Sequence, residues 1–199
     1  MSQFSSCSFR STDRTLLYES RDVGSNPTGN TKLKAHEIYD HVYVGNDETY
    51  EKYKSRSGWS FLRPIKYGPG GHQDILDYHT LAAPKGPEQY VAMKGNNLMA
   101  LNILDLDDPY WMPWDAFKKG LDFVKQRLDA GDKVLIACNS GHSRGPTTGL
   151  MFLRAIGDMP WHFIKSEHIY KTIYPVFDPG TGMRQFARMH WTDLDKMEL

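Results

Sequence analysis

Apolar residues along the chain follow two different spacings, and these spacings distinguish the expected strands from the expected helices. Short apolar runs bounded by turn residues predict strands over 38–44, 59–65, 97–104 and 133–137. The last run, Lys-Val-Leu-Ile-Ala, is continuously apolar after its lysine, which is typical of a strand that is buried on both faces.

Helical spacing is clearest where Phe117, Leu121, Val124 and Leu128 recur. Pro113 is suited to the first turn of that helix and Gly131 to its end. Other helices are expected over 47–54, 144–156, 160–173 and 183–195. Strands that alternate with helices predict a single α/β domain, in which a central, mostly parallel sheet is flanked by helices.

Two segments carry turn signals without periodicity. Residues 1–35 are rich in Ser, Thr, Asn and Gly, and we expect them to form a polar N-terminal extension of a domain that spans 36–199. Residues 67–96 form a long connection, and such connections tend to be functional lids or insertions. Four residues in or beside it either face a pocket or belong to a solvated surface loop: Lys66, His72, Tyr78 and Lys85.

Composition narrows the class of protein. Lys and Arg number 24, as do Asp and Glu, so the balanced charge disfavours nucleic acid or an anionic membrane as a partner. The two cysteines, Cys7 and Cys138, do not form the pattern of a disulfide-stapled secreted module. No apolar run approaches the roughly 18 residues that span a bilayer. We therefore expect a soluble cytoplasmic protein without a membrane span.

The segment after the expected strand 133–137 concentrates the candidate chemistry. Cys138 follows that strand directly and Arg144 begins the next helix; between them lie Asn139, Ser140, Gly141, His142 and Ser143. A loop between a strand end and a helix start turns backbone N–H groups inward, and the helix N-terminus adds partial positive charge. Such a loop binds a dianion such as phosphate and stabilises a cysteine thiolate.

Arg144 is the second reactive group expected there. Its planar guanidinium can hold two phosphate oxygens, which a lysine would not reproduce. A cysteine and an arginine six positions apart also occur by chance, and a buried lone cysteine is often only a small apolar residue. The apolar strand before Cys138, the internal Gly141 and Ser143 and the apolar helix afterwards favour the catalytic or phosphate-binding interpretation.

Cysteine, five residues and arginine at a strand-to-helix junction resemble the signature of the protein tyrosine phosphatase superfamily, and Gly141 with Ser143 resembles its dual-specificity branch. Residues 38–45 look like the first strand of those domains, and residues 117–124 like the helix before the cysteine strand. The tail, with Tyr174-Pro175, Pro179-Gly180 and Gly182-Met183, is similar to compact phosphatases of bacteria and phages. The resemblance implies hydrolysis of a phosphomonoester through a phosphocysteine at Cys138, without a cofactor.

Two positions depart from the usual pattern of that family. Ala137 stands where the family usually has His before the nucleophile, and Gly145 stands where it usually has Ser or Thr after the arginine. The first change could alter ordering of the loop and stabilisation of the thiolate. The second removes a hydroxyl that assists departure of the thiolate, so slower turnover is expected.

The general acid must come from a different segment. In this chemistry an aspartic acid protonates the leaving oxygen and then, as a carboxylate, activates water. Alignment of residues 117–124 with the family helix implies Asp107, with Asp108 as the alternative and Asp105 third. Aspartates near a proline often cap a turn, and we expect at least one of the three to do so.

Other polar and aromatic residues receive weaker assignments. His142 is expected to point outward and shape substrate access. His162 and His168 do not share one helical face and no Cys or carboxylate cluster completes a site, so no metal is predicted. Four tryptophans without interleaved basic residues are expected to be packing or rim residues: Trp111, Trp114, Trp161 and Trp191.

The leading functional hypothesis is a protein tyrosine or dual-specificity phosphatase that acts on a phosphorylated protein or a small phosphomonoester. A catalytically weak phosphate-binding module is the alternative, suggested by Ala137 and Gly145. Sulfur or arsenate chemistry, as in rhodanese-like proteins with similar anion loops, is a third hypothesis, although those proteins usually lack an acidic loop upstream. The sequence leaves phosphotyrosine, phosphoserine, lipid and nucleotide substrates open.

Overall fold

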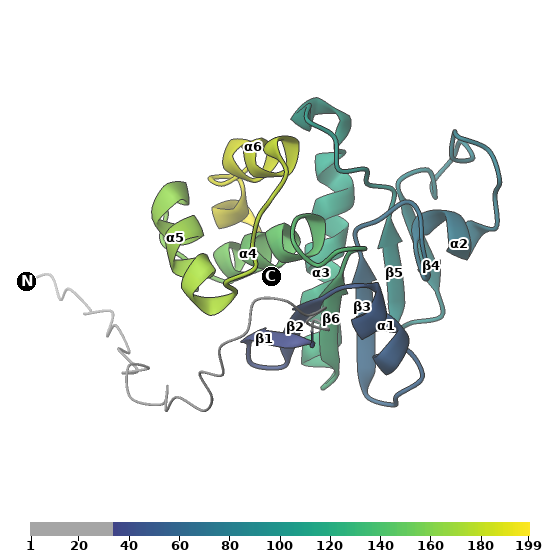
Figure 1. Cartoon of the computed structure of the whole chain (residues 1–199), viewed down its shortest axis with the longest axis horizontal. Helices are drawn as coiled ribbons and strands as arrows, with labels where there is room; N and C mark the ends of the chain where they lie inside the picture. The colour runs from purple at the N-terminus through teal and green to yellow at the C-terminus, as the bar shows by residue number, and fades with distance from the viewer. Residues whose placement is uncertain (1–33) are drawn as a thin grey trace, which may run out of the picture. The chain divides into compact units, whose positions relative to one another are not determined.

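The computed structural model describes residues 34–199 (Figure 1). Cys7 and nearly all of the expected extension over 1–35 lie outside the described residues. The strands are β1 (His36–Tyr39), β2 (Val42–Gly45), β3 (Trp59–Arg63), β4 (Val91–Lys94), β5 (Leu98–Leu101) and β6 (Lys133–Ala137). They form one sheet in the order β1-β2-β6-β3-β5-β4.

The sheet is parallel at its centre and antiparallel at both edges. β6 pairs in parallel with β2 and β3, and β3 pairs in parallel with β5. The edge strands β1 and β4 run antiparallel to β2 and β5. The prediction of one α/β domain with a central, mostly parallel sheet is therefore confirmed.

The helices are α1 (Asp47–Tyr53), α2 (His72–Leu76), α3 (Trp114–Asp129), α4 (Arg144–Ala155), α5 (Phe163–Ile173) and α6 (Thr181–Met189). Short 3-10 turns occur at Pro109–Trp111 and Leu194–Lys196. None of the helices within residues 34–199 has the length and apolar character needed to cross a bilayer.

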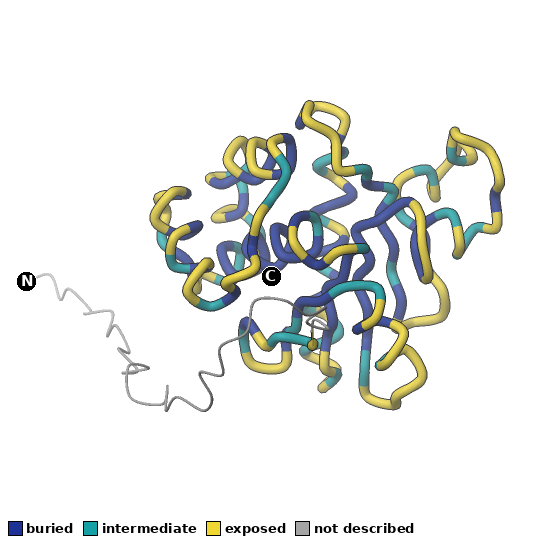
Figure 2. The backbone as a smooth tube through the Cα atoms, in the orientation of Figure 1, coloured by how far each residue is buried: buried dark blue, intermediate teal, exposed yellow. Residues whose placement is uncertain are grey.

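Alternating side chains of β6 face two apolar clusters, one on each side of the sheet. Val134 and Ile136 pack with residues of α3, α4 and α6, whereas Leu135 and Ala137 pack with Tyr50 of α1. All four strand residues are fully buried, and Figure 2 shows the central strands in dark blue. Burial on both faces explains why this strand is continuously apolar.

Three elements differ from the sequence-based expectations. The single strand expected over 38–44 is a hairpin, because Asp40 and His41 form a turn in which His41 has a positive φ of 61°. The connection over 67–96 contains α2 and β4. The apolar run of β4, Val-Ala-Met-Lys, is short and lies near several Gly and Pro residues, so it did not indicate a strand. The helix expected over 183–195 is α6 followed by a 3-10 turn.

Candidate active site

The expected phosphate loop lies at the carboxyl end of β6, directly before α4. Cys138 is buried and forms no disulfide bond with any of the residues 34–199, and its backbone N–H donates to the Gly45 carbonyl oxygen at 3.3 Å. Gly141 has a φ of 80°, a left-handed conformation that side chains other than glycine rarely adopt. A Cβ at position 141 would also lie 3.2 Å from the Asn46 Cβ. Glycine therefore allows the loop to turn tightly against the end of β2.

The loop carries backbone N–H groups that the protein leaves unpaired. Within residues 34–199, the N–H groups of Ser140, Gly141, Ser143 and Arg144 have no hydrogen-bond acceptor. Ser143 occupies the N-cap position of α4, but its side chain does not cap the helix and accepts instead from the Gly180 N–H at 3.0 Å. The N-terminus of α4 thus retains free donors and partial positive charge beside Cys138.

The guanidinium of Arg144 is partly fixed by two other segments. Nη1 donates to the Ile103 carbonyl at 3.2 Å, and Nη2 donates to Oδ1 of Asn139 at 2.7 Å. Nε is buried and has no acceptor within hydrogen-bond distance among the described residues; Oδ2 of Asp105 lies 3.8 Å away. A buried N–H without an acceptor is costly, so an anion oxygen bound here would gain a strong donor.

The three candidate acids occupy different environments. Asp108 accepts from the Tyr110 N–H at 2.9 Å and caps the 3-10 turn, which confirms that one of the three caps a turn. Asp105 lies beside Arg144. Asp107 is exposed, and its carboxylate forms no hydrogen bond or ion pair with any residue over 34–199.

A segment after α5 holds the outside of the phosphate loop. The buried hydroxyl of Tyr174 donates to the Gly141 carbonyl at 2.8 Å, and burial raises the pKa of Tyr174. Nδ1 of His142 contacts the Val176 carbonyl at 2.9 Å, and the Asp178 N–H donates to the His142 carbonyl at 3.0 Å. His142 is exposed and faces this segment, consistent with the outward orientation that we expected.

The residues of the long connection have mainly structural partners. His72 is fully buried between Tyr78 Oη at 3.1 Å and the Glu88 carbonyl at 2.7 Å. Lys66 is buried and donates to the Leu81 carbonyl, whereas Lys85 is exposed. These contacts hold the connection together, because the partners of His72 and Lys66 belong to the same segment.

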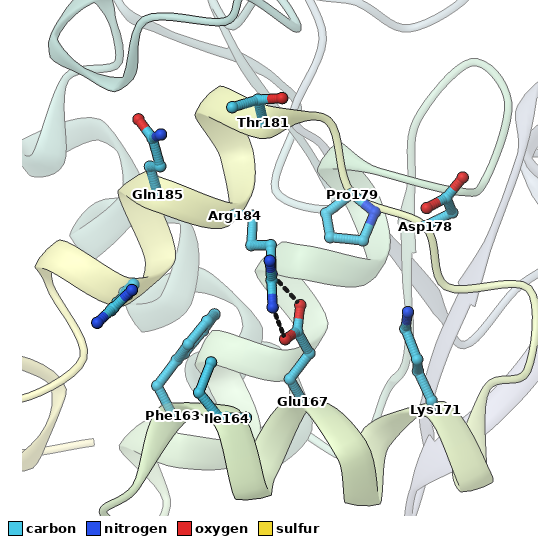
Figure 3. Close-up of a pocket in the computed structure, with 10 residues that line it drawn as sticks. Phe163, Ile164, Glu167, Lys171, Asp178, Pro179, Thr181, Arg184 and Gln185 are labelled. Carbon is cyan, nitrogen blue, oxygen red and sulfur yellow. Dashed lines mark hydrogen bonds and ion pairs between the residues drawn. The ribbon is translucent and has the colours of Figure 1, made fainter.

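A cleft of about 440 Å³ lies between α5 and α6 (Figure 3). The Arg184 guanidinium spans it with two hydrogen bonds of 2.6 Å to the buried Glu167 carboxylate. Asp178 and Pro179 line its edge, next to the residues that hold the phosphate loop, but no residue of 138–144 lines it. The cleft therefore adjoins the candidate active site and is distinct from it.

The remaining candidates cap a helix, pack against other side chains or lie on the surface. His162 occupies the N-cap position of α5 and its ring accepts from the Lys165 N–H at 3.4 Å, which explains why this helix starts later than expected. Trp191 is buried, and Trp114 stacks on His190 with ring centroids 4.4 Å apart. Trp111 and Trp161 are exposed.

Sequence reasoning missed two polar residues near the loop: Asp47, which contacts the loop, and Arg63, which contacts the carbonyl of Ala137 directly before it. Asp47 begins α1 and accepts a hydrogen bond from Asn139 Nδ2 at 3.0 Å. Arg63 ends β3 with a fully buried side chain. A charged residue directly after the apolar pair Phe61-Leu62 of a central strand was the signal that could have identified Arg63.

Comparison with known proteins gives a match in structure but not in sequence. No family model and no curated protein match the chain. The structure of DUSP15 matches with a TM-score of 0.59 and 16% identity, over 82% of this chain and 91% of that chain. The human tyrosine phosphatase-like serine/threonine/tyrosine-interacting protein matches with a TM-score of 0.54 and 14% identity, over 80% and 97%.

A mouse protein assigned as a dual specificity phosphatase, complexed with zinc tungstate, matches with a TM-score of 0.53 and 15% identity, over 88% of this chain and 96% of that chain. The similarity to compact bacterial and phage phosphatases stays a prediction, because these matches do not test it. Matches that cover most of both chains establish the arrangement of the whole domain. The chain therefore has the fold of the protein tyrosine phosphatases, in the form found in their dual-specificity branch.

Proposed function

We propose that the protein hydrolyses phosphomonoesters through a phosphocysteine at Cys138, as a protein tyrosine or dual-specificity phosphatase. The observation that carries the proposal is the set of unpaired donors around one buried cysteine: the N–H groups at the start of α4 and the buried Nε of Arg144. These donors suit the oxygens of a phosphoryl group, and they suit them best when negative charge accumulates in the transition state. A phosphorylated protein or a small phosphomonoester would be the substrate.

The reaction would proceed in two displacements. The Cys138 thiolate attacks phosphorus while the bond to the leaving oxygen breaks, and Asp107 donates the proton that this oxygen needs. The Asp107 carboxylate then accepts a proton from water, whose oxygen attacks phosphorus while the S–P bond breaks. Orthophosphate leaves and the thiolate is regenerated. Asp107 is the preferred acid because it is exposed and unengaged, whereas Asp108 caps a turn.

Hydrolysis of p-nitrophenyl phosphate by the full chain tests this proposal. Wild type should release phosphate continuously, and Cys138→Ser should abolish turnover while tungstate still binds, because Arg144 and the loop N–H groups remain. Tungstate is the probe because a mouse protein of the same fold was crystallised with zinc tungstate. Undiminished turnover by Cys138→Ser would refute the covalent mechanism.

A catalytically weak phosphate-binding module is the second candidate, and Gly145 favours it. A Cβ at position 145 would lie 2.9 Å from the backbone nitrogen of Cys138 and 3.2 Å from the Ile136 carbonyl oxygen. Position 145 therefore has neither a hydroxyl to assist departure of the thiolate nor room for one without a backbone shift. A single burst of product without further turnover would support this candidate over the first.

A further inference from the structure

Arg63 is a buried charge in the centre of the sheet, at the end of β3. Its side chain is 0% exposed, although the other β3 residues at this end, Phe61 and Leu62, are apolar. A buried guanidinium is costly unless hydrogen bonds and an opposite charge compensate for its lost hydration. Its contacts therefore indicate what the residue stabilises.

The guanidinium joins three segments around the catalytic cysteine. Nη1 donates to the Ala137 carbonyl at 3.1 Å, directly before Cys138, and Nε donates to the Pro69 carbonyl at 3.2 Å. Nη2 forms an ion pair with Oδ1 of Asp47. The Tyr50 ring lies against the guanidinium, with its centroid 4.6 Å from Cζ of Arg63. All three guanidinium nitrogens are thus hydrogen-bonded.

Asp47 extends these contacts to the second reactive residue. Its Oδ2 accepts from Asn139 Nδ2 at 3.0 Å, and its backbone N–H donates to the Asn139 carbonyl at 3.2 Å. The opposite side of the Asn139 amide, Oδ1, accepts from Nη2 of Arg144 at 2.7 Å. A continuous polar chain therefore runs from Arg63 through Asp47 and Asn139 to Arg144.

We infer that Arg63 is a positioning residue for the proposed phosphatase reaction: it orients Arg144 through Asp47 and Asn139, and its positive charge stabilises the Cys138 thiolate. The inference rests on the proposed function. Arginine keeps its charge when buried, and charges interact strongly where water is excluded. Burial lowers the pKa of Arg63, while the charges of Asp47 and Cys138 act in the opposite direction. Ala137 contributes its carbonyl to this arrangement and no polar side chain.

The test measures the pH dependence of Cys138 alkylation by iodoacetamide in the full chain, in a Cys7→Ser background. Arg63→Met should raise the pH midpoint of alkylation by about one unit, the shift expected for loss of one nearby charge in a buried site. Asp47→Asn should not raise the alkylation midpoint, because loss of a negative charge does not disfavour the thiolate. Both variants should weaken tungstate binding by roughly 10-fold or more, since Arg144 loses its support.

Arg127→Met is the matched control. Arg127 donates to Asp132 Oδ2 at 2.5 Å and to Ser60 Oγ at 3.0 Å, so it is also an ion-paired arginine that contacts β3, but at the opposite end of the strand. Loss of this pair should lower stability without changing the alkylation midpoint or tungstate affinity. If Arg63 had a purely structural role, Arg63→Met would likewise lower stability and leave the alkylation midpoint and tungstate affinity unchanged.

Arg63→Lys keeps the inference testable if Arg63→Met does not fold. Lysine retains the charge but not the three-way hydrogen bonding, so the alkylation midpoint should stay near that of wild type while tungstate affinity falls. An unchanged midpoint in a folded Arg63→Met protein, or unchanged tungstate affinity in both Arg63 variants, would overturn the inference. Absence of phosphatase turnover in wild type would refute the proposed function instead, because alkylation does not require turnover.

Discussion

At the scale of single residues, the three neighbouring aspartates are separated by their contacts. Asp108 is used as a turn cap and Asp105 lies 3.8 Å from Nε of Arg144, so each would be expected to do something other than protonate a leaving group. Asp107 has no such contact within residues 34–199. The alignment with the family helix and the contacts in the structure therefore both favour Asp107 as the general acid.

Asp107→Asn should slow hydrolysis of phosphotyrosine or an alkyl phosphate by about 10²-fold or more, because these leaving groups need a proton in the transition state. An activated aryl phosphate should lose much less. The basic limb of the pH–rate profile should also flatten, since the acid no longer titrates. Asp105→Asn should mainly change KM, and Asp108→Asn should mainly lower stability. If Asp108→Asn, and not Asp107→Asn, slows poor leaving groups more than activated ones, Asp108 is the general acid.

Arg144→Lys tests the guanidinium itself. Lysine keeps the charge but supplies neither the donor at Nε nor the contact of Nη2 with Asn139. We expect kcat/KM to fall by about 10²-fold or more, the range for loss of one preorganised donor to the transition state. A loss below about threefold in steady-state kinetics would mean that Arg144 does not contact the phosphoryl group.

At the scale of elements, α6 packs closely against the loop that carries the candidate acids. A Cβ at Gly182 would overlap the Leu106 carbonyl oxygen and lie 2.9 Å from the Asp107 carbonyl carbon. Only glycine allows α6 to approach the backbone of this loop so closely. The distance between Asp107 and Cys138 therefore depends on a helix that follows both of them in sequence.

Gly182→Ala should displace the acidic loop and reduce turnover of phosphotyrosine by roughly 10- to 100-fold, as misplacement of a catalytic group by about 1 Å can do. Tungstate affinity and turnover of an activated aryl phosphate should change little. Gln185→Ala, an exposed position on the same helix, is the control. Equal losses for both substrates in Gly182→Ala would contradict the assignment of this glycine to the acid loop.

The 72–90 segment should lose stability in mild acid. Burial lowers the pKa of His72, against the opposing effect of the hydrogen bond to Glu88. Above the ordinary histidine pKa of about 6.5, His72 is neutral in both the folded and the unfolded chain, so its full contribution to the free energy of unfolding is present. As pH falls below that value, the unfolded chain takes up the proton first, so stability is lost until His72 itself protonates.

Thermal unfolding between about pH 7.5 and 5.5 measures this effect. The loss of Tm on acidification should be smaller in His72→Gln than in wild type, because glutamine does not titrate. His79→Gln is the control, because its side chain is 90% exposed. An identical pH dependence in wild type and His72→Gln would contradict the assignment.

The sequence was informative wherever local patterns decide structure. The strand over 133–137, the cysteine loop and the helix after it follow from apolar runs and spacing that require no distant partner. The hairpin was missed because it depends on a single turn residue, His41, which has a positive φ. Strand β4 was missed because it depends on pairing with β5. Arg63, Gly180 and Gly182 were missed as site residues because their roles come from contacts between segments far apart in sequence.

At the scale of the whole molecule, the candidate site is assembled from most of the domain. Cys138 directly follows β6 and Arg144 begins α4. Arg63 of β3 and Asp47 of α1 contact the segment around Cys138, and the segment after α5 holds the loop from outside. If the proposed function is correct, Arg144 and the loop around Cys138 are held in place by these contacts before substrate binds, and such preorganisation favours stabilisation of a transition state.

Trapping of the phosphorylated enzyme tests the central claim most directly. Because position 145 offers no hydroxyl to assist departure of the thiolate, breakdown of the intermediate should be slow and the phosphoenzyme should accumulate during turnover of an activated aryl phosphate. Acid quench followed by mass spectrometry should find one phosphoryl group on the peptide that contains Cys138, and none on that peptide in Cys138→Ser. Steady turnover with the phosphoryl group on another residue, or undiminished turnover in Cys138→Ser, would contradict the account.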